Sequence, residues 1–221
     1  MSDDEHPSGA GRLLMGLTWA ALLLALWHWG VQVTDVRQNT SAPATGDMAA
    51  VGRPPDTELP PAALPLGNAL PLRIDIPALG VQAPVMPRGL DRQGAIEPPP
   101  FDQAGTVGWY AAGTGPGAAG AALMVGHLDT ETRPAVFYKL SSLRPGRTVR
   151  VFRDDGKVAE FTVDDIQVQN RDHFDAHQAY GQHRPGRAEL RLITCGGAFD
   201  RTGGTYTANV IVSAYLTGTG H

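Results

Sequence analysis

The sequence has a single cysteine, Cys195, among 221 residues, which excludes an intramolecular disulfide framework. It also lacks an excess of basic residues: the formal net charge is −4, so a nucleic-acid-binding surface is not expected. Beyond the N-terminal region there is no long helical periodicity, and no internal repeat is found. What remains is a chain with 27 glycines and 18 prolines, a composition that favours many short strands separated by turns.

One long apolar run is present, near the N-terminus. Residues 13–33 contain no charged side chain and include three tryptophans. A helix of this length crosses a bilayer core of about 30 Å, so we expect a transmembrane helix. A cleaved signal peptide is the competing interpretation, with Ala42-Pro43-Ala44 as its cleavage site. That site lies well beyond the run, and the run exceeds the usual ~7–15 residues, which favours an uncleaved signal anchor.

The rest of the chain divides by composition. A proline- and alanine-rich stretch cannot build a core and is expected to form an extended linker. The following 147 or so residues suit one folded domain. With the short polar N-terminus inside the cell, this domain lies outside the cytoplasm at the cell membrane. The expected organisation is a cytoplasmic tail at 1–12, a transmembrane signal anchor at 13–33, a linker at 34–69, a folded domain at 70–216 and a C-terminal tail at 217–221.

Short strands fill the folded domain. Alternation in 72–76 predicts a strand that Pro77 ends, and Asp154-Asp155-Gly156 predicts a hairpin turn whose first strand directs Arg150 and Arg153 outward. The fold class is therefore mainly β, a closed antiparallel barrel of about eight strands with short helical turns. The expected strands are 72–76, 81–85, 95–96, 106–111, 121–126, 148–152, 158–168, 190–195 and 206–216, with a helical turn within 135–143.

Cys195 follows the apolar alternation of 190–194, and Gly196-Gly197 is expected to end that strand. A lone thiol of this kind is either a small core hydrophobe or a nucleophile. A nucleophilic thiol needs a base, and His127 ends the buried run 122–126 much as Cys195 ends its own. Two strand ends in one small barrel bring imidazole and thiol to the same rim. A metal site built from His127, Asp129 and Cys195 lacks close ligand spacing, so neither metal nor cofactor is predicted.

These two motifs resemble those of the sortases. The sequence VGHLD at 125–129 is followed 68 positions later by LITC at 192–195, and CGGAFD at 195–200 with its spacing to Tyr206 and Asn209 is most similar to class E/F sortases of actinobacteria. The resemblance runs through the whole folded domain. Papain-like peptidases place cysteine before histidine, and an L,D-transpeptidase would carry a Ser-His-Gly-Cys type of motif, so both fit less well.

The resemblance implies a transpeptidase. The thiolate of Cys195 would attack the threonine carbonyl of an LPxTG-like sorting signal, expel glycine and form a thioester that an amine resolves. His127 would protonate the leaving amine and deprotonate the incoming one. The implied partners are secreted proteins with a C-terminal sorting signal, a peptidoglycan precursor or another amine, and the membrane.

One position departs from the family. Sortases carry an arginine on the strand after the cysteine, where it stabilises the oxyanion, and this chain has Thr207 there. Threonine offers one uncharged hydrogen-bond donor, whereas the guanidinium of arginine offers several donors and a positive charge. Loss of an oxyanion donor lowers the rate roughly 10²–10³-fold. Arg201 and Arg191 are the candidate replacements. The alternative function is a catalytically impaired sortase-fold module that binds peptides.

Overall fold

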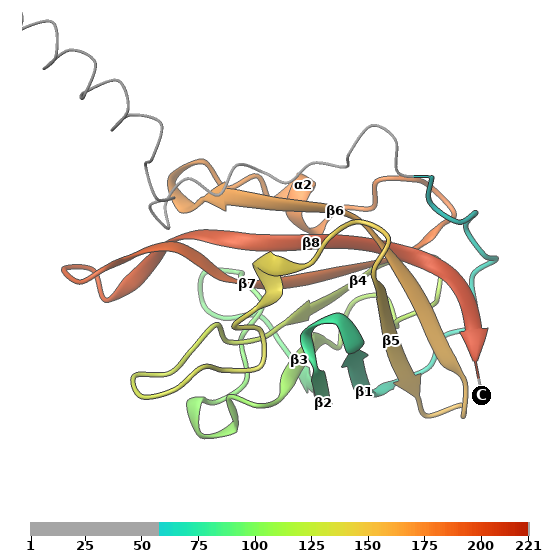
Figure 1. Cartoon of the computed structure of the whole chain (residues 1–221), viewed down its shortest axis with the longest axis horizontal. Helices are drawn as coiled ribbons and strands as arrows, with labels where there is room; N and C mark the ends of the chain where they lie inside the picture. The colour runs from blue at the N-terminus through green and yellow to red at the C-terminus, as the bar shows by residue number, and fades with distance from the viewer. Residues whose placement is uncertain (1–57, 221) are drawn as a thin grey trace, which may run out of the picture. The chain divides into compact units, whose positions relative to one another are not determined.

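The structure is a computed structural model that describes residues 58–220. Eight strands close into a barrel in the order β1-β2-β3-β4-β7-β8-β6-β5 (Figure 1). The predicted fold class, a mainly-β closed barrel of eight strands with short helical turns, is confirmed. The strands are β1 (Pro71–Ile76), β2 (Val81–Arg88), β3 (Val107–Tyr110), β4 (Gly120–Val125), β5 (Thr148–Arg153), β6 (Val158–Asn170), β7 (Ala188–Asp200) and β8 (Thr205–Gly220). The helical elements are η1 (Pro77–Leu79), η2 (Phe101–Gln103), η3 (Leu140–Ser142), η4 (Arg171–His173) and α2 (Ala176–Tyr180).

The sequence predicted an antiparallel barrel, but two of the strand pairs are parallel. β2 pairs with β3 in parallel, and β4 pairs with β7 in parallel. Parallel neighbours need a long crossover connection, and the chain supplies two, at 89–106 and 126–187. The prediction missed them because it counted strands and turns without asking which strands are neighbours. The parallel β4–β7 pair matters most, since it carries the two candidate catalytic motifs.

Two shorter predictions also differ from the structure. The segment 95–96 forms only an isolated bridge between Leu90 and Ile96, and within 135–143 the regular helical part is limited to η3. Both segments lie in long connections between strands, where local propensity is weak evidence for a regular element.

Apolar alternation places the core. Leu190 and Leu192 of β7 are fully buried inside the barrel, together with Ile74 and Ile76 of β1. Ile193 has the opposite parity and packs on the outer face, in a second small cluster with Ala179 of α2 and Ile211 of β8. The connection between β6 and β7 therefore covers the outer face of these two strands, close to the cysteine.

The glycines after the cysteine do not end the strand. β7 continues to Asp200 and pairs with β8, with a bulge between Gly196 and Phe199. Gly197 adopts φ 76°, a left-handed conformation that glycine takes without strain, so the pair of glycines bends the strand rather than stopping it. Cys195 thus lies within a long strand just before a bulge, and the predicted strand end was wrong.

The prediction that Arg153 points outward was also wrong, because its side chain is buried. Residues 150 and 153 are three apart and so lie on opposite faces of β5, and only Arg150 is exposed. Arg153 is 3% exposed, pairs with Asp155 at 2.8 Å and donates to the carbonyl oxygens of Gly67 and Pro116, both at 2.8 Å. These partners compensate the loss of hydration that burial of the charge requires.

The chain before β1 lies against the barrel. The Ala63 amide donates to the carbonyl oxygen of Leu216 at 2.9 Å, and the Tyr215 hydroxyl donates to that of Pro60 at 2.6 Å. These residues belong to the C-terminal part of the linker expected at 34–69. The expected anchor at 13–33 lies outside the described residues, and within 58–220 no helix is long and apolar enough to cross a membrane.

Candidate active site

The register of β4 and β7 aligns the candidate histidine with the candidate cysteine. Val125 pairs with Ile193 in this parallel ladder, an offset of 68 positions that also separates His127 from Cys195. The Thr194 hydroxyl donates to the carbonyl oxygen of Gly126 at 2.8 Å, which carries the alignment past the end of β4. His127 and Cys195 line one cleft of about 540 Å³. The structure therefore brings the two sequence-predicted residues together.

Three parts of the chain form this cleft. Phe101 of η2 lies on one side, the segment 127–131 follows β4, and residues from Phe199 to Tyr206 come from the β7–β8 hairpin. A second hollow of about 570 Å³ shares Phe101, Thr130 and Glu131 with it. The thiol thus lies in a cleft that borders a second hollow. Among residues 58–220, no group of three or more histidine, cysteine, aspartate or glutamate side chains is arranged to hold a metal ion.

The thiol of Cys195 is solvent-accessible in the cleft, but its surroundings raise its pKa. Loss of hydration is the main cause, the positive charge of Arg171 opposes it, and the negative charge of Asp129 adds to it. A raised pKa leaves the thiol protonated at neutral pH. Nucleophilic attack therefore needs a neighbouring group that accepts the thiol proton.

His127 is positioned by its neighbours to be that group. It is 9% exposed, and its Nε2 lies 2.6 Å from the carbonyl oxygen of Pro99. Its ring stacks on Phe101 with centroids 4.4 Å apart and an interplanar angle of 22°. A carbonyl oxygen can only accept, so Nε2 carries a hydrogen, and in the neutral ring the lone pair belongs to Nδ1. Proton exchange in this arrangement uses Nδ1.

We predict that Phe101→Ala exposes His127. Loss of an aromatic stack worth about 0.5–1.5 kcal/mol should raise the rate of His127 modification by diethyl pyrocarbonate roughly two- to tenfold. Peptide mass spectrometry measures the rate, with His183 as an internal reference. Phe199→Ala is the matched control, since Phe199 lines the cleft but contacts the ring of Tyr206 instead. Equal rates in both variants would mean that Phe101 does not cover the histidine.

Tyr206 and Asp129 connect the two sides of the cleft. The Tyr206 hydroxyl donates to the Asp129 carboxylate, which joins β8 to the segment after β4. Burial, followed by this hydrogen bond, raises the pKa of Tyr206 to about 12. The phenol therefore stays protonated at any physiological pH. The sequence signalled Tyr206 only through its spacing from Cys195, and the partnership with Asp129 was not foreseen.

Thr207, which was predicted to stand at the arginine position, forms a hydrogen bond with the backbone. Its hydroxyl oxygen accepts from the Ala198 amide at 3.1 Å and so supports the bulge at Gly197. Thr205 and Tyr206 line the cleft, but among the described cleft residues Thr207 is not found. Its uncharged hydroxyl is thus engaged in holding the hairpin.

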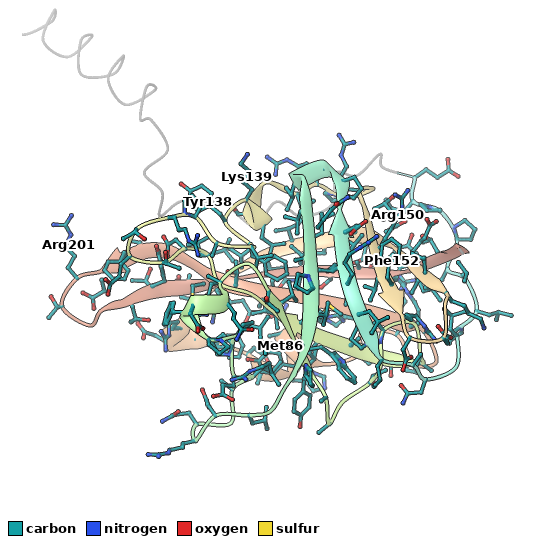
Figure 2. All side chains as sticks on the ribbon, turned by 90° about the horizontal axis from the view of Figure 1, so that it is seen from below. Met86, Tyr138, Lys139, Arg150, Phe152 and Arg201 are labelled. Carbon is teal, nitrogen blue, oxygen red and sulfur yellow. The ribbon has the colours of Figure 1, made fainter. Side chains whose placement is uncertain are left out.

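Neither predicted replacement for the arginine reaches the cleft. Arg201 is exposed at the tip of the β7–β8 hairpin and projects away from the barrel (Figure 2). Arg191 is 1% exposed and pairs with Glu189 at 2.6 Å, and it also donates to the carbonyl oxygen of Gly181 at 2.9 Å. It lies four residues before Cys195 on an extended strand, roughly 13 Å away. Both expectations were wrong, because sequence distance and strand parity do not report side-chain partners.

The buried Arg191–Glu189 pair leads to a stability prediction. Glu189→Ala would leave the Arg191 charge buried without its carboxylate, which typically costs about 3–5 kcal/mol of unfolding free energy. Urea denaturation measures the change. The matched control is Glu160→Ala, which removes an exposed pair with Arg150 and should cost under about 1 kcal/mol. Equal losses in the two variants would contradict the assignment.

Arg171 is the residue that the sequence did not single out. It lies in η4, directly after β6, and donates to the hydroxyl oxygen of Thr205 in the cleft. In the sequence it opens a polar stretch with no motif, and only the pairing of β6 with β8 brings it to the site. No local signal predicts this placement.

Comparison with known proteins agrees with the fold and with the predicted family. The family model of the sortase domain matches residues 74–217. Three solved structures are similar to this chain, at identities that indicate likeness of fold alone. The SrtA sortase from Actinomyces oris has a TM-score of 0.52 and 20% identity, covering 74% of this chain and 89% of that one. The lid mutant of sortase A from Corynebacterium diphtheriae has a TM-score of 0.50 and 16% identity, covering 68% and 72%. Sortase C-3 from Streptococcus pneumoniae has a TM-score of 0.50 and 15% identity, covering 69% and 65%. No curated protein sequence matches the chain significantly.

Proposed function

Because this chain belongs to the sortase family, we propose that it is a membrane-anchored cysteine transpeptidase. Its substrate would be an LPxTG-like sorting signal at the C-terminus of a secreted protein, and its acceptor a cell-wall amine such as a peptidoglycan precursor. The observation that carries the proposal is the shared register of His127 and Cys195, which places a base and a thiol in one cleft. The likeness to class E/F rests on 195–200 and the spacing to Tyr206, whereas the similar solved structures are sortases A and C.

The first half-reaction forms a thioester. As the threonine carbonyl approaches, Nδ1 of His127 takes the proton of the Cys195 thiol, and the sulfur forms a bond to the carbonyl carbon. The carbonyl π electrons move onto oxygen and give an oxyanion. When this intermediate collapses, the C–N bond to glycine breaks and His127 returns the proton to the leaving amine. The raised thiol pKa supports this order, because the thiol holds its proton until the base removes it.

The second half-reaction releases the acyl group. A neutral acceptor amine attacks the thioester carbon, and His127 takes a proton from its nitrogen. The C–S bond then breaks, a new amide remains, and the leaving sulfur of Cys195 takes up the proton held by the imidazolium. Attack by water in place of the amine gives hydrolysis by the same proton transfers.

The proposed organisation follows the expected one. Residues 13–33 would anchor the chain, 34–69 would connect the anchor to the barrel, and the catalytic domain, expected at 70–216, would work outside the cytoplasm. The tail expected at 217–221 needs correction, because β8 continues to Gly220 and residues 218–220 pair with β6. This arrangement presents the cleft to secreted substrates at the membrane surface. The charge-free position of Thr207 favours the second candidate function, a sortase-fold module that binds peptides without cleaving them.

Incubation of the full-length chain in detergent with an LPxTG peptide and triglycine tests the proposal. We expect a product in which the peptide's threonine is joined to triglycine, detected by mass spectrometry and absent with Cys195→Ala. Circular dichroism of both proteins confirms that the barrel is folded. A folded wild-type chain that binds the peptide and yields no product would reject the enzyme and favour the binding module.

A further inference from the structure

We propose that Arg171 supplies the positive charge that Thr207 lacks, by donating hydrogen bonds to the substrate carbonyl oxygen as Cys195 attacks. This inference rests on the proposed function and names a residue that contacts the reacting atoms. The charged hydrogen-bond donor would then come from η4, directly after β6, and not from β8.

Sheet register brings Arg171 to the arginine position. β6, β8 and β7 lie side by side (Figure 1), and Gln169, Asn209 and Cys195 form one row across them. The β6–β8 ladder ends at the pair Asn170–Ala208, so Arg171, the first residue of η4, and Thr207 of β8 each lie one position beyond that last pair. Neighbouring strands are about 4.8 Å apart, so the end of β6, where Arg171 begins η4, is about one strand spacing from the β8 segment that holds Thr207.

The side chain of Arg171 reaches the cleft. Its guanidinium donates to the hydroxyl of Thr205, which lines the same cleft as Cys195. Among the residues that the structure describes, Thr205 is its one hydrogen-bond partner. Arginine has five N–H donors in a fixed fork, so donors remain for a ligand oxygen.

The partner of Arg171 is neutral, unlike those of two buried arginines of the barrel. Arg191 and Arg153 are each bonded to a carboxylate, which compensates their charge. A hydroxyl orients a guanidinium without neutralising it. The charge of Arg171 is therefore available to stabilise an oxyanion, for which a guanidinium is well suited.

The charge of Arg171 also influences the thiol. The pKa of Cys195 is raised by burial, and the positive charge of Arg171 is the main influence that opposes this rise. Among described basic side chains, Arg171 is the one whose charge acts on the thiol. This influence agrees with the contact to Thr205, which places the guanidinium at the cleft that holds the sulfur.

The test compares Arg171→Gln with Arg201→Gln in the full-length chain. Arg201→Gln is the control, because it removes an exposed arginine at the tip of the β7–β8 hairpin, outside the residues that line the cleft. We expect Arg171→Gln to lower kcat/KM for the LPxTG peptide roughly 10²–10³-fold and Arg201→Gln to leave it within about twofold. Adding Thr207→Arg to Arg171→Gln should restore part of the activity. The pH dependence of iodoacetamide alkylation should show a higher thiol pKa in Arg171→Gln alone.

The outcomes separate this inference from the proposed function. Equal turnover of wild type and Arg171→Gln, with equal melting temperatures, would overturn the role of Arg171 and leave the transpeptidase intact. An inactive wild type would reject the transpeptidase, and alkylation would still decide about Arg171. An unchanged thiol pKa in Arg171→Gln would then show that the charge of Arg171 does not act on Cys195 and would overturn the inference. A raised thiol pKa in this variant would show that the charge does act on Cys195.

Discussion

Replacing Cys195 by alanine is expected to remove transpeptidation almost entirely, by on the order of 10⁴-fold or more in kcat. Without the sulfur no thioester forms, and His127 has no nucleophile to deprotonate. Cys195 is the chain's one cysteine, so no second thiol substitutes for it. The measurement is product formation from an LPxTG peptide and triglycine under conditions where the wild type turns over many times.

Intact-protein mass spectrometry identifies the intermediate directly. In the absence of amine, the wild type should gain the mass of the acyl fragment, and hydroxylamine should remove it. Cys195→Ser keeps the shape of the side chain and should accumulate at most traces of a more stable ester. An acyl adduct that persists in Cys195→Ala would place the nucleophile elsewhere and contradict the mechanism.

Replacing His127 by alanine is expected to lower kcat/KM by roughly 10²–10⁴-fold, the usual value of a positioned general acid and base. The loss should be large because the pKa of Cys195 is raised and little thiolate exists at neutral pH. Raising the pH should recover part of the acylation rate, since hydroxide then removes the thiol proton. Single-turnover kinetics measured across pH test both statements.

His183→Ala is the control for His127→Ala. His183 lies in the exposed β6–β7 connection, where its ring is 3.1 Å from the carbonyl oxygen of Gln178, outside the residues that line the cleft. Its removal should leave turnover unchanged. If His127→Ala retained wild-type acylation at neutral pH, the proton would leave the thiol by another route, and the role assigned to His127 would be wrong.

The orientation of the His127 ring matters for the predictions on both Cys195 and His127. Pro99 and Phe101 hold the ring from the side of the 89–106 connection, which leaves Nδ1 to exchange protons. The tripeptide Pro98-Pro99-Pro100 restricts the backbone before η2, so the carbonyl of Pro99 is presented by a stiff segment. The orientation of the base thus depends on a connection that contains no catalytic motif.

Local patterning determined a good part of this protein. Alternation in segments such as 72–76 predicts strands because every second side chain of a strand faces the core, and that holds wherever the strand lies in the barrel. The buried run before His127 and the alternation before Cys195 follow the same rule. Their separation of 68 positions was readable as a family resemblance, and it equals the offset of the β4–β7 ladder.

The tertiary structure alone decided what surrounds the thiol. Gly196-Gly197 reads locally as a strand end, but the long partner strand β8 keeps β7 paired through the bulge. Arg191 and Arg201 appeared to be the nearest arginines because they are close to Cys195 in sequence, yet one is paired and buried and the other is at the hairpin tip. Arg171 is brought in across two strands, and interstrand register is a property of the closed barrel that no short segment of sequence contains.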